Sequence, residues 1–136
     1  MAIEMIKFND QELRKMLTTV DQEKIDNMAF GAVELDANGN ILRYNMAEGE
    51  IVGRKPKDVI GKNFFDEVAP CTKSPEFYGL FTEIVRTNRD GFDKFQFVFD
   101  YKMQPTKVSV MLARSVTKTN GAYSYWVFVK RLEAGI

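Results

Sequence analysis

Histidine is absent from this chain of 136 residues, and cysteine occurs only once, as Cys71. Without histidine the chain cannot form Ser-His-Asp or Cys-His catalytic groups, and it lacks the commonest ligand of catalytic zinc. A single cysteine excludes a disulfide within the chain, which fits a reducing compartment, and cannot by itself make a structural zinc site. We therefore expect neither a metal site nor an enzyme of the usual hydrolase kinds.

The chain also lacks an excess of either charge, because 19 basic residues balance 19 acidic ones. A nucleic-acid-binding domain usually carries a basic excess, so we expect no nucleic-acid partner. No apolar run approaches the roughly 18–20 residues of a membrane helix, and residues 1–8 lack the apolar core of a signal peptide. These absences predict a cytoplasmic protein that does not associate with membranes. Separately, we expect a monomer.

What is present predicts one α+β domain. Residues 9–28 have the spacing of two short helices, capped by Asn9 or Asp10 and by Asp21, which we expect to pack on the larger body as a lid. Asn38-Gly39 between apolar runs predicts a hairpin. The longest helix is expected over 76–89. The other strands are indicated by strict alternation over 94–103, by Val108, Val110 and Leu112, and by a nearly continuous apolar run over 123–129, expected to be central.

This order predicts a five-stranded antiparallel sheet with helices on one face and a short N-terminal helical cap. The chain divides into the cap at 1–28, a core at 29–132 and a tail at 133–136. The eleven phenylalanines are best explained as core, since Phe95, Phe97 and Phe99 simply share one face of a strand.

Three residues in the middle of the chain could carry chemistry. Cys71 lies in a loop bracketed by Pro70 and Pro75, and it is either an inert buried thiol or a nucleophile and attachment point. Glu48 follows Tyr44 by four residues, where a strand passes into a helical turn. Glutamate is usually exposed, so the local sequence favours a solvated carboxylate; burial would instead raise its pKa and keep it protonated. Arg54, taken alone, would be an ordinary surface guanidinium.

Taken together, these residues resemble the photoactive yellow protein family. The similarity covers nearly the whole chain and is weakest over 1–25 and 113–122. Asn63-Phe64-Phe65 followed by Ala69-Pro70-Cys71 is its most specific part, because PAS domains in general share the fold but not this cysteine. The matching segments are 44–54, 60–65, 68–72, 74–79, 99–103 and 125–131.

The resemblance implies a PAS-type fold and a 4-hydroxycinnamic (p-coumaric) acid chromophore, thioester-linked to Cys71. It also implies that Tyr44 and Glu48 hydrogen-bond the chromophore phenolate, while Arg54 covers the pocket. Further chromophore-binding positions by this resemblance are Val52, Phe64, Pro70, Phe97 and Met103. The implied function is blue-light reception, in which trans-to-cis isomerisation is followed by proton transfer from buried Glu48 and by partial unfolding, read by an unknown downstream signalling protein.

Two positions depart from the family pattern. Val52 stands where a threonine is common, and its missing hydroxyl would leave Tyr44 less tightly held. Phe97 replaces a common tyrosine and removes a polar tip near the ring. Both changes bear on colour and recovery rate, whereas neither affects attachment or proton transfer.

Two other functions are compatible with the residues. A PAS-type module could bind another ligand or a protein without any covalent chromophore. A thiol enzyme is also conceivable, but without histidine Cys71 would need lysine or arginine as its activator.

Overall fold

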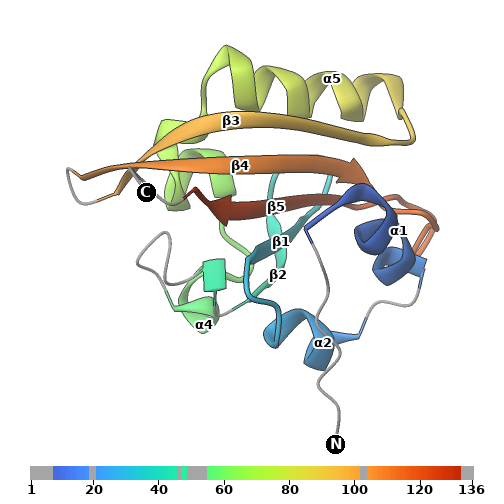
Figure 1. Ribbon diagram of the computed structural model, residues 1–136. Helices are drawn as coiled ribbons and strands as arrows, with labels where there is room; N and C mark the ends of the chain where they lie inside the picture. The colour runs from blue at the N-terminus through green and yellow to red at the C-terminus, as the bar shows by residue number, and fades with distance from the viewer. Residues whose placement is uncertain (1–7, 19–20, 46, 49–54, 102–103, 133–136) are drawn as a thin grey trace, which may run out of the picture.

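The computed structural model describes residues 8–18, 21–45, 47–48, 55–101 and 104–132. Their centre is a five-stranded antiparallel sheet in the order β2-β1-β5-β4-β3 (Figure 1). The expected α+β class and five-stranded sheet are thereby confirmed. The strands are β1 (Gly31–Leu35), β2 (Ile41–Tyr44), β3 (Phe92–Tyr101), β4 (Gln104–Arg114) and β5 (Tyr125–Arg131).

Strand β5 is central, as its apolar sequence predicts, and residues 125–129 are all buried. Successive side chains of a strand point to opposite faces. Tyr125, Val127 and Val129 therefore enter one hydrophobic cluster, while Trp126 and Phe128 enter another on the opposite face. We call the first the site-side cluster and the second the cap-side cluster.

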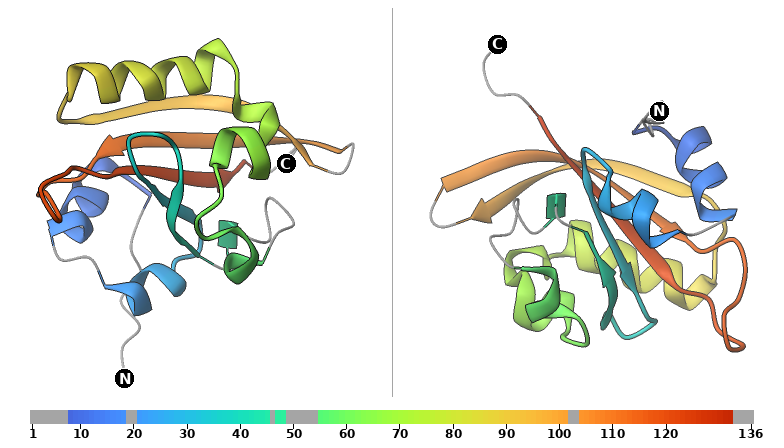
Figure 2. Two further views of the ribbon diagram at one scale, coloured as in Figure 1. Left: turned by 180° about the vertical axis from the view of Figure 1, so that it is seen from behind. Right: turned by 90° about the horizontal axis from the view of Figure 1, so that it is seen from below.

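The site-side cluster is covered by short helices between β2 and β3. They are α4 (Pro56–Val59), the π-helical turn η1 (Phe64–Val68), the 3-10 turn η2 (Pro70–Thr72), the π-helical turn η3 (Pro75–Gly79) and α5 (Leu80–Thr87). Figure 2 shows α5 and these turns on one side of the sheet and the N-terminal helices on the other.

The helix expected over 76–89 differs from the observed one at both ends. Its first turn is π-helical, since the Gly79 amide donates to the Ser74 carbonyl five residues earlier, at 3.1 Å. It ends at Thr87 because Asn88 adopts a left-handed conformation, with φ of 52°, that stops helix propagation.

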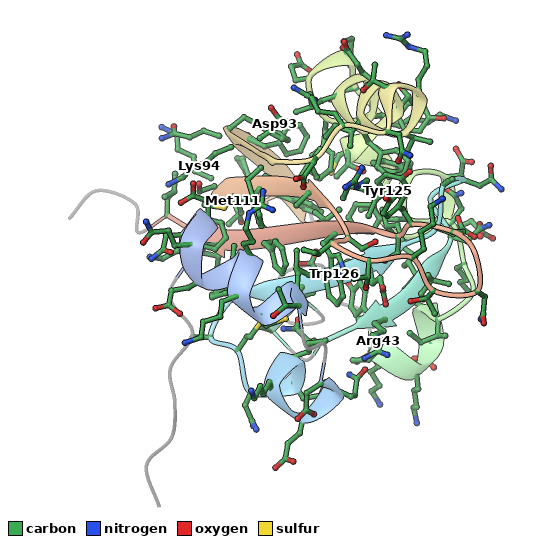
Figure 3. The ribbon with its side chains drawn as sticks, turned by 90° about the vertical axis from the view of Figure 1, so that its right-hand side faces the viewer. Arg43, Asp93, Lys94, Met111, Tyr125 and Trp126 are labelled. Carbon is green, nitrogen blue, oxygen red and sulfur yellow. The ribbon has the colours of Figure 1, made fainter. Side chains whose placement is uncertain are left out.

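The N-terminal cap consists of α1 (Asp10–Thr18) and α2 (Gln22–Asp26), as predicted. Asn9 accepts from the Glu12 amide at 2.9 Å, and Asp21 caps α2 through the Glu23 amide at 2.9 Å. The helices bury Leu13, Met16, Leu17 and Ile25 in the cap-side cluster, and Met111 and Trp126 lie beside α1 (Figure 3).

Surface charges add to the docking of α1. The Arg14 guanidinium lies 3.5 Å from the Asp90 carboxylate, and it sits over the Phe92 ring at 5.6 Å from the centroid. Exposed pairs of this kind contribute at most about 1 kcal/mol, so apolar burial holds the cap more than charge does. Within the described part of the chain, no helix is long and apolar enough to cross a membrane.

Candidate functional site

Tyr44 is the last residue of β2 and faces the site-side cluster. It pairs with Val33 of β1, and both side chains belong to that cluster. The Tyr44 hydroxyl donates to the Glu48 backbone carbonyl at 3.4 Å, a long and therefore weak hydrogen bond. The phenol is only 2% exposed, so its polar tip is held inside the protein.

Glu48 is fully buried, at 0% exposure, and neither of its carboxyl oxygens has a hydrogen-bond partner within the described part of the chain. Desolvation by burial raises the pKa of Glu48 from 4.5 to about 8, so the carboxyl is protonated at neutral pH. The solvated carboxylate favoured by local sequence is therefore wrong. The Glu48 side chain lies against Gly31 of β1. The polarity of the neighbouring residues in the sequence does not predict this contact.

Cys71 lies in the 3-10 turn η2, between the two π-helical turns η1 and η3. The Thr72 hydroxyl and amide both donate to the Ala69 carbonyl, at 2.6 and 2.9 Å, and these bonds fix the turn. The Cys71 side chain is partly buried and packs against the site-side cluster. Its thiol is thus neither fully buried nor openly exposed.

Two predicted aromatic positions belong to the same cluster. Phe64 is fully buried, and Phe97 is a partly buried residue packed against the cluster. Phe77 joins them, with ring centroids 6.2 Å from Phe64 and 5.3 Å from Phe97. Pro70 is exposed and contributes as the first residue of the turn that carries Cys71. Val52, Arg54 and Met103 lie outside the described residues.

Asn45 is a buried residue that sequence reasoning missed. Its side-chain oxygen accepts from the amides of Ala32 and Glu48, at 3.0 and 2.9 Å. Its side-chain nitrogen donates to the carbonyls of Ile25 and Phe30, at 2.9 and 3.0 Å. Asparagine three residues before glutamate is the spacing of a helix-capping pair, and that pattern could have revealed it. Asn45 therefore ties the Glu48 turn to β1 and to the cap.

An Asn45→Ala substitution should destabilise the protein by at least about 2 kcal/mol, because it leaves buried backbone donors and acceptors without partners. Urea unfolding measures this loss. Because the Ile25 bond would also be lost, limited proteolysis should cut residues 9–28 faster. A matched control is Asn38→Ala in the exposed β1–β2 turn, which should change both readings little. Equal stability of Asn45→Ala and the parent protein would contradict this role.

The site combines three groups: the phenol of Tyr44 in the site-side cluster, the thiol of Cys71 packed against that cluster, and the buried, protonated carboxyl of Glu48, whose backbone carbonyl accepts from Tyr44. The first two can donate hydrogen bonds to an anionic ligand oxygen, and the thiol can form a covalent bond. Among the described residues, no group of three or more acidic or cysteine side chains could hold a metal ion.

Comparison with known proteins shows which family the chain resembles. The family model of the PAS fold matches residues 21–131. A photoactive yellow protein from Rhodothalassium salexigens is 51% identical over 130 residues, covering 96% of this chain and all of that protein. One from Halochromatium salexigens is 47% identical over 128 residues, covering 94% of this chain and 98% of that one.

A solved structure shows the same relationship. The photoactive yellow protein domain of the sensor histidine kinase Ppr from Rhodospirillum centenum superposes with a TM-score of 0.76 at 37% identity, covering 86% of this chain and 98% of that domain. Sequence similarity over nearly the full length and a common fold place the chain in the photoactive yellow protein family, a family of photoreceptors built on the PAS fold.

Proposed function

We propose that this chain is a blue-light photoreceptor that carries 4-hydroxycinnamic acid as a thioester on Cys71. The observation that carries the proposal is the buried Glu48 carboxyl, whose two oxygens have no hydrogen-bond partner among the described residues. Its backbone carbonyl accepts from Tyr44, and Tyr44 and Cys71 lie in or against the site-side cluster. A buried polar group without a partner is costly, so a functional ligand is a good explanation for it. Membership of the photoactive yellow protein family supports the same conclusion.

The residues present fit such a ligand. Glu48 and Tyr44 offer donors to a phenolate oxygen, the rings of Phe64 and Phe97 suit an aromatic body, and Cys71 offers the sulfur for the thioester. When bound, the chromophore supplies blue-light absorption and trans-to-cis isomerisation. Side chains of the protein must do the rest: they hold the phenolate, supply a proton and pass the change on to the N-terminal cap.

Glu48 must stay protonated beside a phenolate, although a glutamate carboxyl (about 4.3) is ordinarily far more acidic than a phenol (about 10). Complete burial supplies the reversal, because a localised carboxylate is expensive to bury. Hydrogen bonds from Glu48 and Tyr44 to an ionised oxygen are roughly twice as strong as those to a neutral one. The carboxyl and the phenolate then titrate as a coupled pair.

The proposed signal is a loosening of the N-terminal cap that begins when Glu48 loses its proton. If Glu48 gives its proton to the phenolate oxygen after isomerisation, an unpaired carboxylate remains in an apolar site, which costs about 3–5 kcal/mol. That is comparable with the roughly 5–15 kcal/mol that stabilise a small domain. Asn45 connects the Glu48 amide to the Ile25 carbonyl of α2, so a shift of the turn would weaken the attachment of the cap. Residues 9–28 would then loosen and present a changed surface to a downstream signalling protein.

Reconstitution tests the proposal directly. The protein is mixed with an activated hydroxycinnamate, such as its anhydride, and is then studied by mass spectrometry and visible spectroscopy before and after blue illumination. We expect the mass to rise by one hydroxycinnamoyl group and the solution to turn yellow. Illumination should bleach the band reversibly. Absence of the adduct, or an adduct without a light response, would overturn the proposal.

The competing function is a PAS-type module that binds a ligand or a protein without a covalent chromophore. The fold alone is compatible with it, since PAS domains of other kinds superpose on this chain at low identity. The same reconstitution separates the two, because a non-covalent module would gain no mass that survives denaturation.

A further inference from the structure

Gly31 occupies a strand position whose backbone conformation does not require glycine. It is the first residue of β1 and pairs with Val129 of β5. The glycines with a positive φ in the described chain are Gly39, Gly61, Gly91 and Gly121, and Gly31 is not one of them. Any residue could adopt its backbone, and glycine in a strand weakens it. Another reason must account for the missing side chain.

Glu48 supplies that reason. A Cβ placed on Gly31 would overlap the Oε2 atom of Glu48, and it would lie 3.1 Å from the Glu48 Cδ and 3.2 Å from its Cα. The first contact cannot exist, and the others are tighter than ordinary contacts. By strand alternation Gly31 faces the same side as Val33 and Val129, both in the site-side cluster. The carboxyl thus lies directly on the β1 backbone.

We propose that Gly31 is a positioning residue for the proton donor: its missing side chain leaves the space in which the Glu48 carboxyl lies on β1. A larger residue would push the carboxyl off the strand and alter its approach to a ligand oxygen. This inference rests on the proposed function only for its effect on the photocycle, because the contact between Gly31 and Glu48 exists without a chromophore.

Burial alone accounts for the raised pKa of Glu48. The phenol and thiol groups in or against the site-side cluster are those of Tyr44, Cys71, Tyr78, Tyr123 and Tyr125. Charged side chains lie over two of these rings, with Lys73 over Tyr78 and Arg114 and Lys118 over Tyr123. No ion pair reaches Glu48 among the described residues, and desolvation by burial is the cause of its raised pKa. A displaced carboxyl should therefore be recognised by its own titration.

The experiment compares Gly31→Ala with Gly79→Ala, a glycine with a helical backbone and nothing within 4 Å of an added Cβ. The infrared C=O band of protonated Glu48, identified by its loss in Glu48→Gln, is followed with pH in the protein without chromophore. We expect Gly31→Ala to shift the band and to move its midpoint from about 8 toward the ordinary 4.5. Gly79→Ala should change neither. An unchanged band and midpoint in Gly31→Ala would overturn the proposal.

A double substitution covers the case in which Gly31→Ala folds poorly. Truncating Glu48 removes the clashing carboxyl and leaves only the 3.2 Å contact with its Cα, so Gly31→Ala should lower the urea midpoint of the parent protein much more than that of Glu48→Ala. Equal losses in both backgrounds would overturn the proposal. The two proposals fail separately. If the parent protein stays colourless after treatment with hydroxycinnamic anhydride, the proposed function fails. The coupling between Gly31 and Glu48 is still tested, because the infrared and urea measurements use the protein without chromophore.

Discussion

A Cys71→Ser variant is expected to gain no hydroxycinnamoyl group and to stay colourless after treatment with the activated acid. Thioester formation requires sulfur to attack the acyl carbon: the S–C bond forms, the activating carboxylate leaves, and the thiol proton passes to solvent. A serine hydroxyl is a poor nucleophile without a base, and the chain has no histidine to supply one. Intact mass after denaturation and the visible spectrum measure the loss, which should be complete.

The control moves the thiol instead of removing it. Glu83 lies exposed on α5, so Cys71→Ser/Glu83→Cys keeps one cysteine at an open surface position. Acylation there would add mass but should give no reversible light response, because a ligand on the exposed face of α5 would not reach the buried Glu48 carboxyl. A fully photoactive Glu83 adduct, or normal colour in Cys71→Ser, would show that Cys71 is not the attachment point.

The second large effect concerns pH and the Glu48 carboxyl in the protein without chromophore. Its pKa is about 8 in the folded state because of burial, against 4.5 ordinarily. Between these values the unfolded chain is ionised while the folded protein holds the proton, so folding takes up one proton. Stability is therefore greatest below pH 4.5 as far as this group is concerned, and it falls as pH rises toward 8 by somewhat more than about 1 kcal/mol for each pH unit.

Glu48→Gln removes this dependence. Relative to the parent protein, the variant should gain stability steadily from pH 5 to 8 and then level off, with a total change on the order of 4 kcal/mol. Urea unfolding of both proteins across this range gives the difference. Exposed Glu76 provides the matched control: its pKa is lowered by backbone and Ser74 hydrogen bonds, so Glu76→Gln should not change the slope above pH 5. Parallel curves for Glu48→Gln and the parent protein would contradict a buried neutral Glu48.

In the reconstituted protein, Glu48→Gln also removes the proton that the proposed signal requires. An amide can still donate a hydrogen bond to the phenolate oxygen, so the variant should bind chromophore, but no buried carboxylate can form. Release of residues 9–28 under blue light should then largely disappear, as judged by limited proteolysis. If the variant kept a long-lived signalling state with the same proton movements and the same helix release, the proposed mechanism would be wrong.

The sequence by itself determined the elements with a clear period and the chemistry that was possible. Alternation of Phe95, Phe97 and Phe99 predicts a strand with one buried face, and the apolar run at 125–129 predicts the central strand. A single cysteine and the absence of histidine limited the candidates to one thiol. The two strand predictions are confirmed because alternation and apolar runs are local properties that do not depend on how distant segments meet.

Only the tertiary structure decided where Glu48, Asn45 and Gly31 lie and what they contact. The burial of Glu48 depends on β1, 17 residues earlier in the chain, and Asn45 bonds to Ile25, 20 residues away. Likewise, the π-helical first turn over 75–79 interrupts a pattern that reads as one regular helix. Whether a polar side chain is solvated or buried depends on contacts between distant segments, and the desolvation that raises the pKa of Glu48 arises only when those segments come together.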